Sequence, residues 1–156
     1  MNKTFCLFLA VFLSYMVCGQ NFTQVYSDNN GNTYTGALNR IETDALGNVY
    51  NSTTYSNAPI TIGDITFPIQ GNLCSVIIKR DAEGTLLWAR SLACGYTALV
   101  SDLYADSEGN LYVTGFFGNP QTVSTLNSTP FELEGAVGMS FFLLKYNPAG
   151  EILWSR

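Results

Sequence analysis

The sequence predicts an all-β protein made of four-stranded antiparallel blades of a β-propeller, with about two units plus an N-terminal strand, an incomplete ring. Two repeated segments and the absence of a helical apolar pattern predict this fold. The segment Asp44-Ala-Leu-Gly-Asn-Val-Tyr50 recurs 62 residues later as Asp106-Ser-Glu-Gly-Asn-Leu-Tyr112. The segment from Ile77 to Arg90 recurs 66 residues later, from Leu143 to Arg156. No apolar spacing of i, i+3, i+4, i+7 persists beyond the N-terminal segment, so we expect no helix there.

Alternating and β-branched residues place the strands in order. The N-terminal strand is expected at 22–26. In the first unit, roughly 37–96, we expect a weak strand at 37–43 and then strands at 49–54, 75–80 and 86–91. The stretch 55–73 is predicted to be irregular, with short extended pieces at 60–62 and 65–67. In the second unit, roughly 97–156, strands are expected at 99–105, 111–117, 139–146 and 152–155, with a polar, Pro-containing stretch at 118–138.

Four tight turns join these strands. Each has Asp or Asn first, whose side chain can accept a hydrogen bond from the backbone two residues on, and Gly fourth, which supplies the left-handed conformation of a bulged type I turn. The pairs are Asp44 and Gly47, Asp81 and Gly84, Asp106 and Gly109, and Asn147 and Gly150. A calcium loop is the alternative interpretation. We favour plain turns, because neither alternating oxygen ligands nor a distal Glu is present.

Two strands are apolar at every position rather than at alternate ones, namely 76–78 and 141–144. Such strands are covered on both faces, which in an all-β chain indicates sheets stacked one on another. Four aromatic residues recur at fixed places and are expected to fill the gaps between blades: Tyr50, Trp88, Tyr112 and Trp154. A sugar-binding aromatic platform is the functional alternative for the same residues.

The N-terminus has the features of a cleaved signal peptide. Lys3 precedes an apolar run at 5–17, which is shorter than the roughly 20 residues that span a bilayer. We expect cleavage after Gly19, so that residues 1–19 are the signal peptide and 20–156 are the β-propeller repeat region. The predicted localisation is therefore secreted or cell surface, with no membrane span once the leader is removed.

Composition excludes several functional classes. The net charge is −5 at pH 7, with Lys and Arg scattered singly, so we expect no nucleic-acid partner. The chain has no histidine, which removes His-based catalysis and His-ligated zinc. We predict no catalytic residue, no metal site and no cofactor. In an oxidising compartment Cys74 and Cys94 form a candidate disulfide across the open end of the 75–91 hairpin, with two buried thiols as the alternative.

The second unit resembles a bacterial repeat family called SBBP, the seven-bladed beta-propeller repeat. Asp106-Ser-Glu-Gly-Asn-Leu-Tyr-Val-Thr-Gly-Phe-Phe117 is similar to its D-x-x-G-N-x-Y-V-T-G-x-F. The segment from Phe142 to Trp154 is similar to its F-V-A-K-Y-D-x-x-G-x-x-x-W. The first unit departs from the pattern at 51–53, and both units have Ser where Asp commonly precedes the apolar strand, at Ser75 and Ser140. The resemblance implies an exported, often large protein, frequently from Bacteroidetes-type bacteria, without common catalytic residues.

Two units cannot close a ring of four to eight blades, so we expect a C-terminally truncated array whose partners are further repeat units. Two open apolar faces are then expected, one at 76–78 and one at 141–144, and they would favour self-association. The predicted function is a non-catalytic exported scaffold, or a module that presents 55–73 and 118–138 to an extracellular protein or glycan. The alternative is part of a propeller hydrolase or lyase whose active site lies largely outside this segment.

Overall fold

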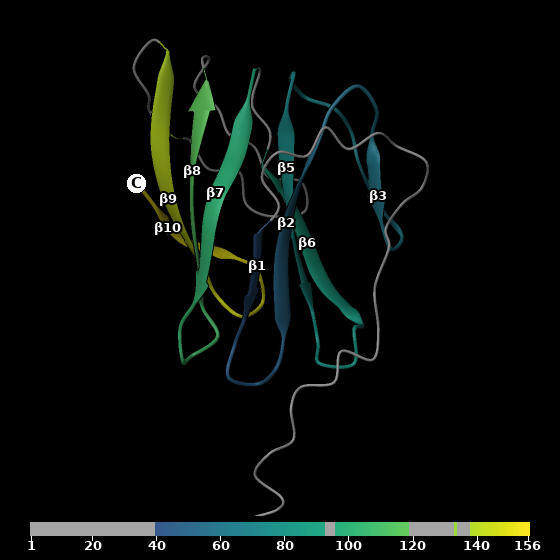
Figure 1. The fold of residues 1–156 in the computed structure, drawn as a ribbon, viewed down its shortest axis with the longest axis vertical. Helices are drawn as coiled ribbons and strands as arrows, with labels where there is room; N and C mark the ends of the chain where they lie inside the picture. The colour runs from purple at the N-terminus through teal and green to yellow at the C-terminus, as the bar shows by residue number, and fades with distance from the viewer. Residues whose placement is uncertain (1–39, 93–95, 119–132, 134–137) are drawn as a thin grey trace, which may run out of the picture.

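The computed structural model describes residues 40–92, 96–118, 133 and 138–156, which form two four-stranded antiparallel sheets and one small hairpin. Figure 1 shows the sheets side by side, with the small hairpin on the far side of the first sheet. The described residues contain no helix. The all-β prediction with four-stranded antiparallel blades is confirmed, and the two sheets do not close into a ring.

The first blade has strand order β1-β2-β5-β6. Its strands are β1 (Arg40–Thr43), β2 (Val49–Tyr55), β5 (Cys74–Arg80) and β6 (Leu86–Leu92). The hairpin of β3 (Ile60–Ile62) and β4 (Ile65–Phe67) is inserted between β2 and β5. The two extended pieces expected within 55–73 therefore pair with each other, with Ile60 opposite Phe67.

The second blade is a meander with strand order β7-β8-β9-β10. Its strands are β7 (Ala98–Ala105), β8 (Leu111–Gly118), β9 (Met139–Tyr146) and β10 (Ile152–Ser155). The strands of both blades lie within one or two residues of the predicted bounds, apart from β1, whose predicted start lies outside the described residues. The predicted strand at 22–26 and the signal peptide also lie outside them.

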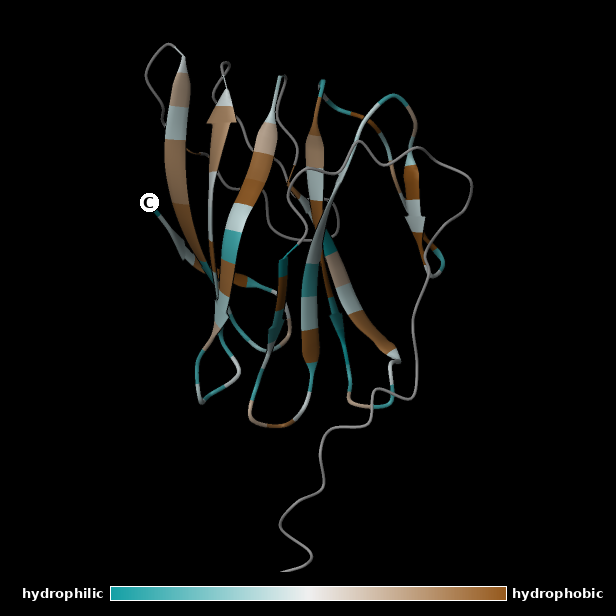
Figure 2. Ribbon diagram, in the orientation of Figure 1, coloured by the Kyte–Doolittle hydropathy of each residue, from teal (hydrophilic) through white to brown (hydrophobic). Residues whose placement is uncertain are grey.

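The main core lies between the two blades. The first blade contributes Tyr50, Ile77, Trp88 and Leu92. The second blade contributes one face of β7, β8 and β9, including Val113, Phe142, Leu144 and Tyr146. In Figure 2 brown apolar segments lie along the strands, whereas the turns at the lower end are largely teal. Stacking of one sheet on the next thus buries the apolar strands, as expected for blade-like units.

A second core lies on the opposite side of the first blade and corrects one expectation. Val76 and Ile78 pack there against the β3–β4 hairpin, through Ile60, Ile62 and Phe67, all of which are buried. The stretch 76–78 was expected to form an open face, and that expectation was wrong. The hairpin acts as a cap because β3 and β4 bury alternate apolar side chains while Thr61 and Thr66 face outward.

The second blade keeps one open face. On β9, Phe142 and Leu144 point into the core, while Phe141, 85% exposed, and the partly buried Leu143 point the other way. Tyr104 on β7 and Leu153 on β10 are also exposed. The open apolar face predicted at 141–144 therefore holds for Phe141 and Leu143, whereas Phe142 and Leu144 lie in the core between the blades.

Candidate functional site

All four turns have the same local geometry and lie at the same end of the two blades (Figure 1). In each, the side-chain oxygen of the first residue accepts hydrogen bonds from the backbone amides two and four residues on. In each, the glycine amide donates to the carbonyl of the first residue, at 2.9–3.0 Å. The glycine φ values are 82°, 88°, 78° and 77° for Gly47, Gly84, Gly109 and Gly150. The repeated Asp/Asn and Gly are therefore used to build the turns.

Around the first of these turns, five side chains form what we call the first docking set: Asp44, Tyr50, Lys79, Trp88 and Arg90. The Tyr50 hydroxyl lies 3.0 Å from Asp44 Oδ2, and Lys79 Nζ lies 4.0 Å from the same oxygen and 4.9 Å from the centre of the Tyr50 ring. Trp88 packs edge-on against Tyr50 at 6.0 Å, and the Arg90 guanidinium lies 5.6 Å from the Trp88 ring. Three strands, β2, β5 and β6, and the β1–β2 turn supply these groups.

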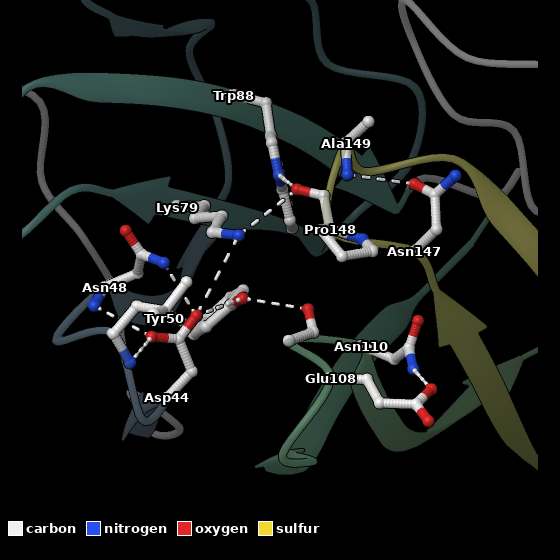
Figure 3. Close-up of polar contacts among 12 residues, drawn as sticks. Asp44, Asn48, Tyr50, Lys79, Trp88, Glu108, Asn110, Asn147, Pro148 and Ala149 are labelled. Atoms are coloured by element: carbon white, nitrogen blue, oxygen red, sulfur yellow. Dashed lines mark hydrogen bonds and ion pairs between the residues drawn. The ribbon is translucent and has the colours of Figure 1, made fainter.

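Side chains of the first docking set donate hydrogen bonds to backbone carbonyls of the β9–β10 turn in the second blade (Figure 3). Trp88 Nε1 donates to the Pro148 carbonyl at 3.0 Å, and Lys79 Nζ donates to the same oxygen at 3.2 Å. Arg90 donates to the carbonyls of Gly150, at 2.8 Å, and Ala149, at 3.3 Å. Three successive carbonyls that a turn leaves unpaired are thus satisfied by another blade.

Two glycines of the second blade approach this set closely, but not equally. A Cβ at Gly150 would lie 2.8 Å from the Trp88 ring. A Cβ at Gly109 would lie no closer than 3.6 Å to any neighbour, and the Gly109 carbonyl lies 3.1 Å from the Tyr50 hydroxyl. Glycine is therefore required at position 150 for two reasons: the backbone there is left-handed, and a side chain would clash with the Trp88 indole.

The same five residue types recur in the second blade as the second docking set: Asp106, Tyr112, Lys145, Trp154 and Arg156. Tyr112 and Trp154 lie 6.0 Å apart, Lys145 Nζ is 3.6 Å from Asp106 Oδ2 and 4.7 Å from the Tyr112 ring, and Arg156 is 5.9 Å from the Trp154 ring. These distances match those of the first docking set closely. The described residues place no turn against the second set, which lies on the open face.

Burial separates the two sets electrostatically. The Lys79 and Asp44 side chains are 5% and 2% exposed, whereas those of Lys145 and Asp106 are 18% and 21% exposed. Burial lowers the pKa of Lys79, against the opposing attraction of Asp44. The neighbouring Tyr112 hydroxyl and the Asp106 carboxylate instead raise the pKa of Lys145. The same charge pair thus has opposite lysine shifts because only one copy is covered.

Both repeated carboxylates are held ionised by their own turns. Burial alone would raise the pKa of Asp44, but hydrogen bonds from Asn48, Tyr50 and the Leu46 amide together lower it below 3.8. The pKa of Asp106 is also lowered, chiefly by the Asn110 side chain. Neither arrangement leaves a carboxyl group with the raised pKa of a general acid.

The structure brings some of the sequence-predicted residues together and leaves others apart. Tyr50 and Trp88 lie buried between the blades, and Trp88 also stacks on Tyr146 of the second blade at 6.1 Å. Tyr112 and Trp154 pack on each other, partly exposed, on the open face. Cys74 is buried, and its proposed partner Cys94 lies outside the described residues, so the disulfide stays a prediction.

Sequence reasoning missed three contributors to the interface, which are Lys79, Arg90 and the Pro148 carbonyl. A signal for the first two was present, because Lys79 and Lys145, and Arg90 and Arg156, recur at the same 66-residue spacing as the two tryptophans. No signal could identify Pro148, since a backbone carbonyl is available at any residue.

Other kinds of site are not evident in the part of the chain that the structure describes. No group of three or more His, Cys, Asp or Glu side chains in it is arranged to hold a metal ion. A shallow hollow of about 320 Å³ is lined by Tyr96, Gly118, Gly138 and Met139, without a cluster of polar groups. Within the described ranges, no helix is long and apolar enough to cross a membrane.

Two four-stranded sheets, stacked face to face and joined by a recurring set of side chains, define a β-propeller-type repeat. A comparison with known proteins agrees with this class. Over 126 residues the chain is 30% identical to an uncharacterized WD repeat-containing protein of Acanthamoeba polyphaga mimivirus. The match covers 74% of this chain and only 9% of that relative, so the chain spans a small part of the relative's length. No family model matches the chain.

Proposed function

We propose that the chain is a non-catalytic, exported propeller-type scaffold, of the kind that the bacterial SBBP repeats represent, which presents its blade surfaces and loops to an extracellular protein or glycan. The observation that carries the proposal is the use of the recurring polar and aromatic residues. In the first blade Tyr50, Lys79, Trp88 and Arg90 contact carbonyls of the neighbouring blade, and Asp44 positions Tyr50 and Lys79. The five residues therefore build architecture rather than a reaction centre. The similarity to a WD repeat-containing protein supports a scaffold or interaction role.

The exposed surface of the first blade supplies a place for such a partner. The β3–β4 hairpin buries Ile60, Ile62 and Phe67 and turns Thr61 and Thr66 outward, where their hydroxyls lie 3.0 Å apart. A rigid, hydroxyl-bearing strand pair can exchange hydrogen bonds with a polar partner without reorganising. This hairpin belongs to the 55–73 stretch that the sequence singled out for presentation.

An enzyme is the second candidate, and it requires carboxylates from successive blades to converge. Asp44 and Asp106 instead accept hydrogen bonds within their own turns. This use of the repeated carboxylates favours the scaffold over a propeller hydrolase or lyase.

Export is tested with the full chain in a bacterial host that has a periplasm. Osmotic shock should release a protein that begins at Gln20, as measured by intact mass. A control with Leu9→Arg interrupts the apolar run and should keep residue 1 and stay in the cytoplasm. Recovery of both proteins in the cytoplasm with the N-terminus intact would contradict export.

Presentation is tested by adding the purified chain to cell-envelope glycans and to extracellular protein fractions, with binding measured by biolayer interferometry. Thr61→Lys with Thr66→Glu should weaken binding at least about tenfold with little change in the melting temperature, because both side chains face outward and the opposite charges form a cross-strand pair. The matched control is Thr85→Lys on the exposed β5–β6 turn. Equal affinity of all three proteins would argue against the hairpin as the binding surface.

A further inference from the structure

We infer that the second docking set is a specific site for a hairpin turn ending in glycine, presented by a further four-stranded unit of this repeat type. This inference rests on the proposed scaffold function and deepens it by naming the partner of one face. The first docking set is the same site in its occupied form.

The first docking set recognises the β9–β10 turn through backbone atoms of that turn. Three carbonyls accept hydrogen bonds from the Trp, Lys and Arg side chains, so the residues at the second and third turn positions are unconstrained by these contacts. The fourth position is constrained, because a Cβ there would meet the indole at 2.8 Å. The site therefore selects turns that have glycine at the fourth position and rejects turns that lack it.

The second set has the geometry needed for the same ligand. Its Tyr–Trp, Lys–Tyr and Arg–Trp separations are each within about 0.3 Å of those in the first set. Because both copies hold their shape, one covered and one open, binding at the open copy requires little rearrangement of the side chains. Preorganisation of this kind lowers the cost of association.

The rest of the open face indicates what surface the partner's sheet must present. Next to the set, Leu143 takes the place that the buried Ile77 has in the first blade. Phe141 takes the place of Ser75, whose hydroxyl bonds the Ala98 carbonyl and accepts from the Val100 amide across the blade interface. A native partner must therefore offer an apolar recess to Phe141 where β7 offers backbone to Ser75.

A second copy of this chain does not meet that requirement. The face of the first blade that would be presented to the open face is covered by the β3–β4 hairpin, through Val76 and Ile78. The hairpin also approaches Leu86, next to the Asp81–Gly84 turn, since a Cβ at Gly63 would lie 2.8 Å from Leu86 Cδ2. The partner is therefore a unit whose corresponding face is uncapped.

The experiment appends a second copy of residues 91–156 directly after Arg156, which continues the 66-residue spacing. Both the extended chain and a 156-residue comparison chain carry Phe141→Ser, so that the appended strand can approach as β7 approaches Ser75. Hydrogen exchange at the indole N–H groups is followed by NMR, and the Trp154 signal is identified by its loss in Trp154→Phe.

We expect indole exchange at Trp154 to be fast in the comparison chain and at least about tenfold slower in the extended chain. Replacing the appended glycine that corresponds to Gly150 with Ala should return Trp154 to fast exchange. The same replacement at the appended glycine that corresponds to Gly109 should not, although both glycines have a φ near +78°. Slow exchange at Trp88 in every variant verifies that the first interface is intact.

A second measurement does not depend on exchange. Arg156→Ala should lower the urea midpoint of the extended chain more than that of the comparison chain, in which only the packing of Arg156 on Trp154 is lost. Equal shifts in the two chains, or fast Trp154 exchange in both, would overturn the docking site while leaving export and partner binding untouched. Slow Trp154 exchange in the comparison chain, together with a dimer in sedimentation, would also overturn the docking site. So would slowing of Trp154 exchange by added oligosaccharides but not by the appended unit.

Discussion

The two docking sets have the same residue types and similar Tyr–Trp, Lys–Tyr and Arg–Trp distances but different surroundings. The first is covered by the second blade and holds three carbonyls of its turn, whereas the second lies on the open face. The comparison shows that the contacts within a set do not need a neighbouring blade to form. The neighbouring blade adds burial and the hydrogen bonds to its turn. Substitutions in the first set should therefore lower the free energy of unfolding more than the matched substitutions in the second.

The largest difference is expected between the two tryptophans. Trp88→Ala should lower the free energy of unfolding by about 3–5 kcal/mol, because it removes a buried indole between Tyr50 and Tyr146 and leaves a cavity. Trp154→Ala should cost about 1 kcal/mol, since it loses only the packing on Tyr112 and Arg156. Urea unfolding of the two variants measures both. Equal costs would mean that the two sets are covered alike.

The two glycines of the second blade should differ next. Gly109→Ala should cost about 1–2 kcal/mol for a left-handed alanine. Gly150→Ala carries the same strain and also drives its Cβ into the Trp88 ring, which should add about 1–3 kcal/mol. The pair is matched because the φ values, 78° and 77°, are nearly identical. If Gly109→Ala were the more harmful change, the close approach to Trp88 would be wrong.

The two lysines give the smallest effect, and its sign is informative. The pKa of Lys79 is below 10.5 in the folded protein, so between that pKa and 10.5 the unfolded chain binds more protons and stability rises with pH. The pKa of Lys145 is above 10.5, so between 10.5 and that pKa the folded chain binds more protons and stability falls with pH. NMR titration of the lysine side chains should show Lys79 losing its proton first. The reverse order would contradict the difference in burial.

The sequence predicts the blades well because their determinants are local. Turn residues such as Asp106 and Gly109 act within five residues, and strand alternation acts within eight, so each element could be placed without knowledge of its neighbours. The β3–β4 cap could not be predicted, because Ile60 and Phe67 could equally have faced solvent or a partner until their contact with Val76 and Ile78 was known. The recurrence of Lys79 and Arg90 could be seen in the sequence, but the carbonyls that they bind belong to a turn 60 to 69 residues away.

The central claim, that one recurring set is occupied and the other open, is tested most directly by the two indole N–H groups of the 156-residue chain. The sequence has only two tryptophans, so an ¹⁵N-labelled sample gives two indole signals. The structure predicts slow exchange at Trp88, whose Nε1 donates to the Pro148 carbonyl at 3.0 Å, and fast exchange at Trp154. Equal exchange rates at the two indoles, or faster exchange at Trp88, would contradict it.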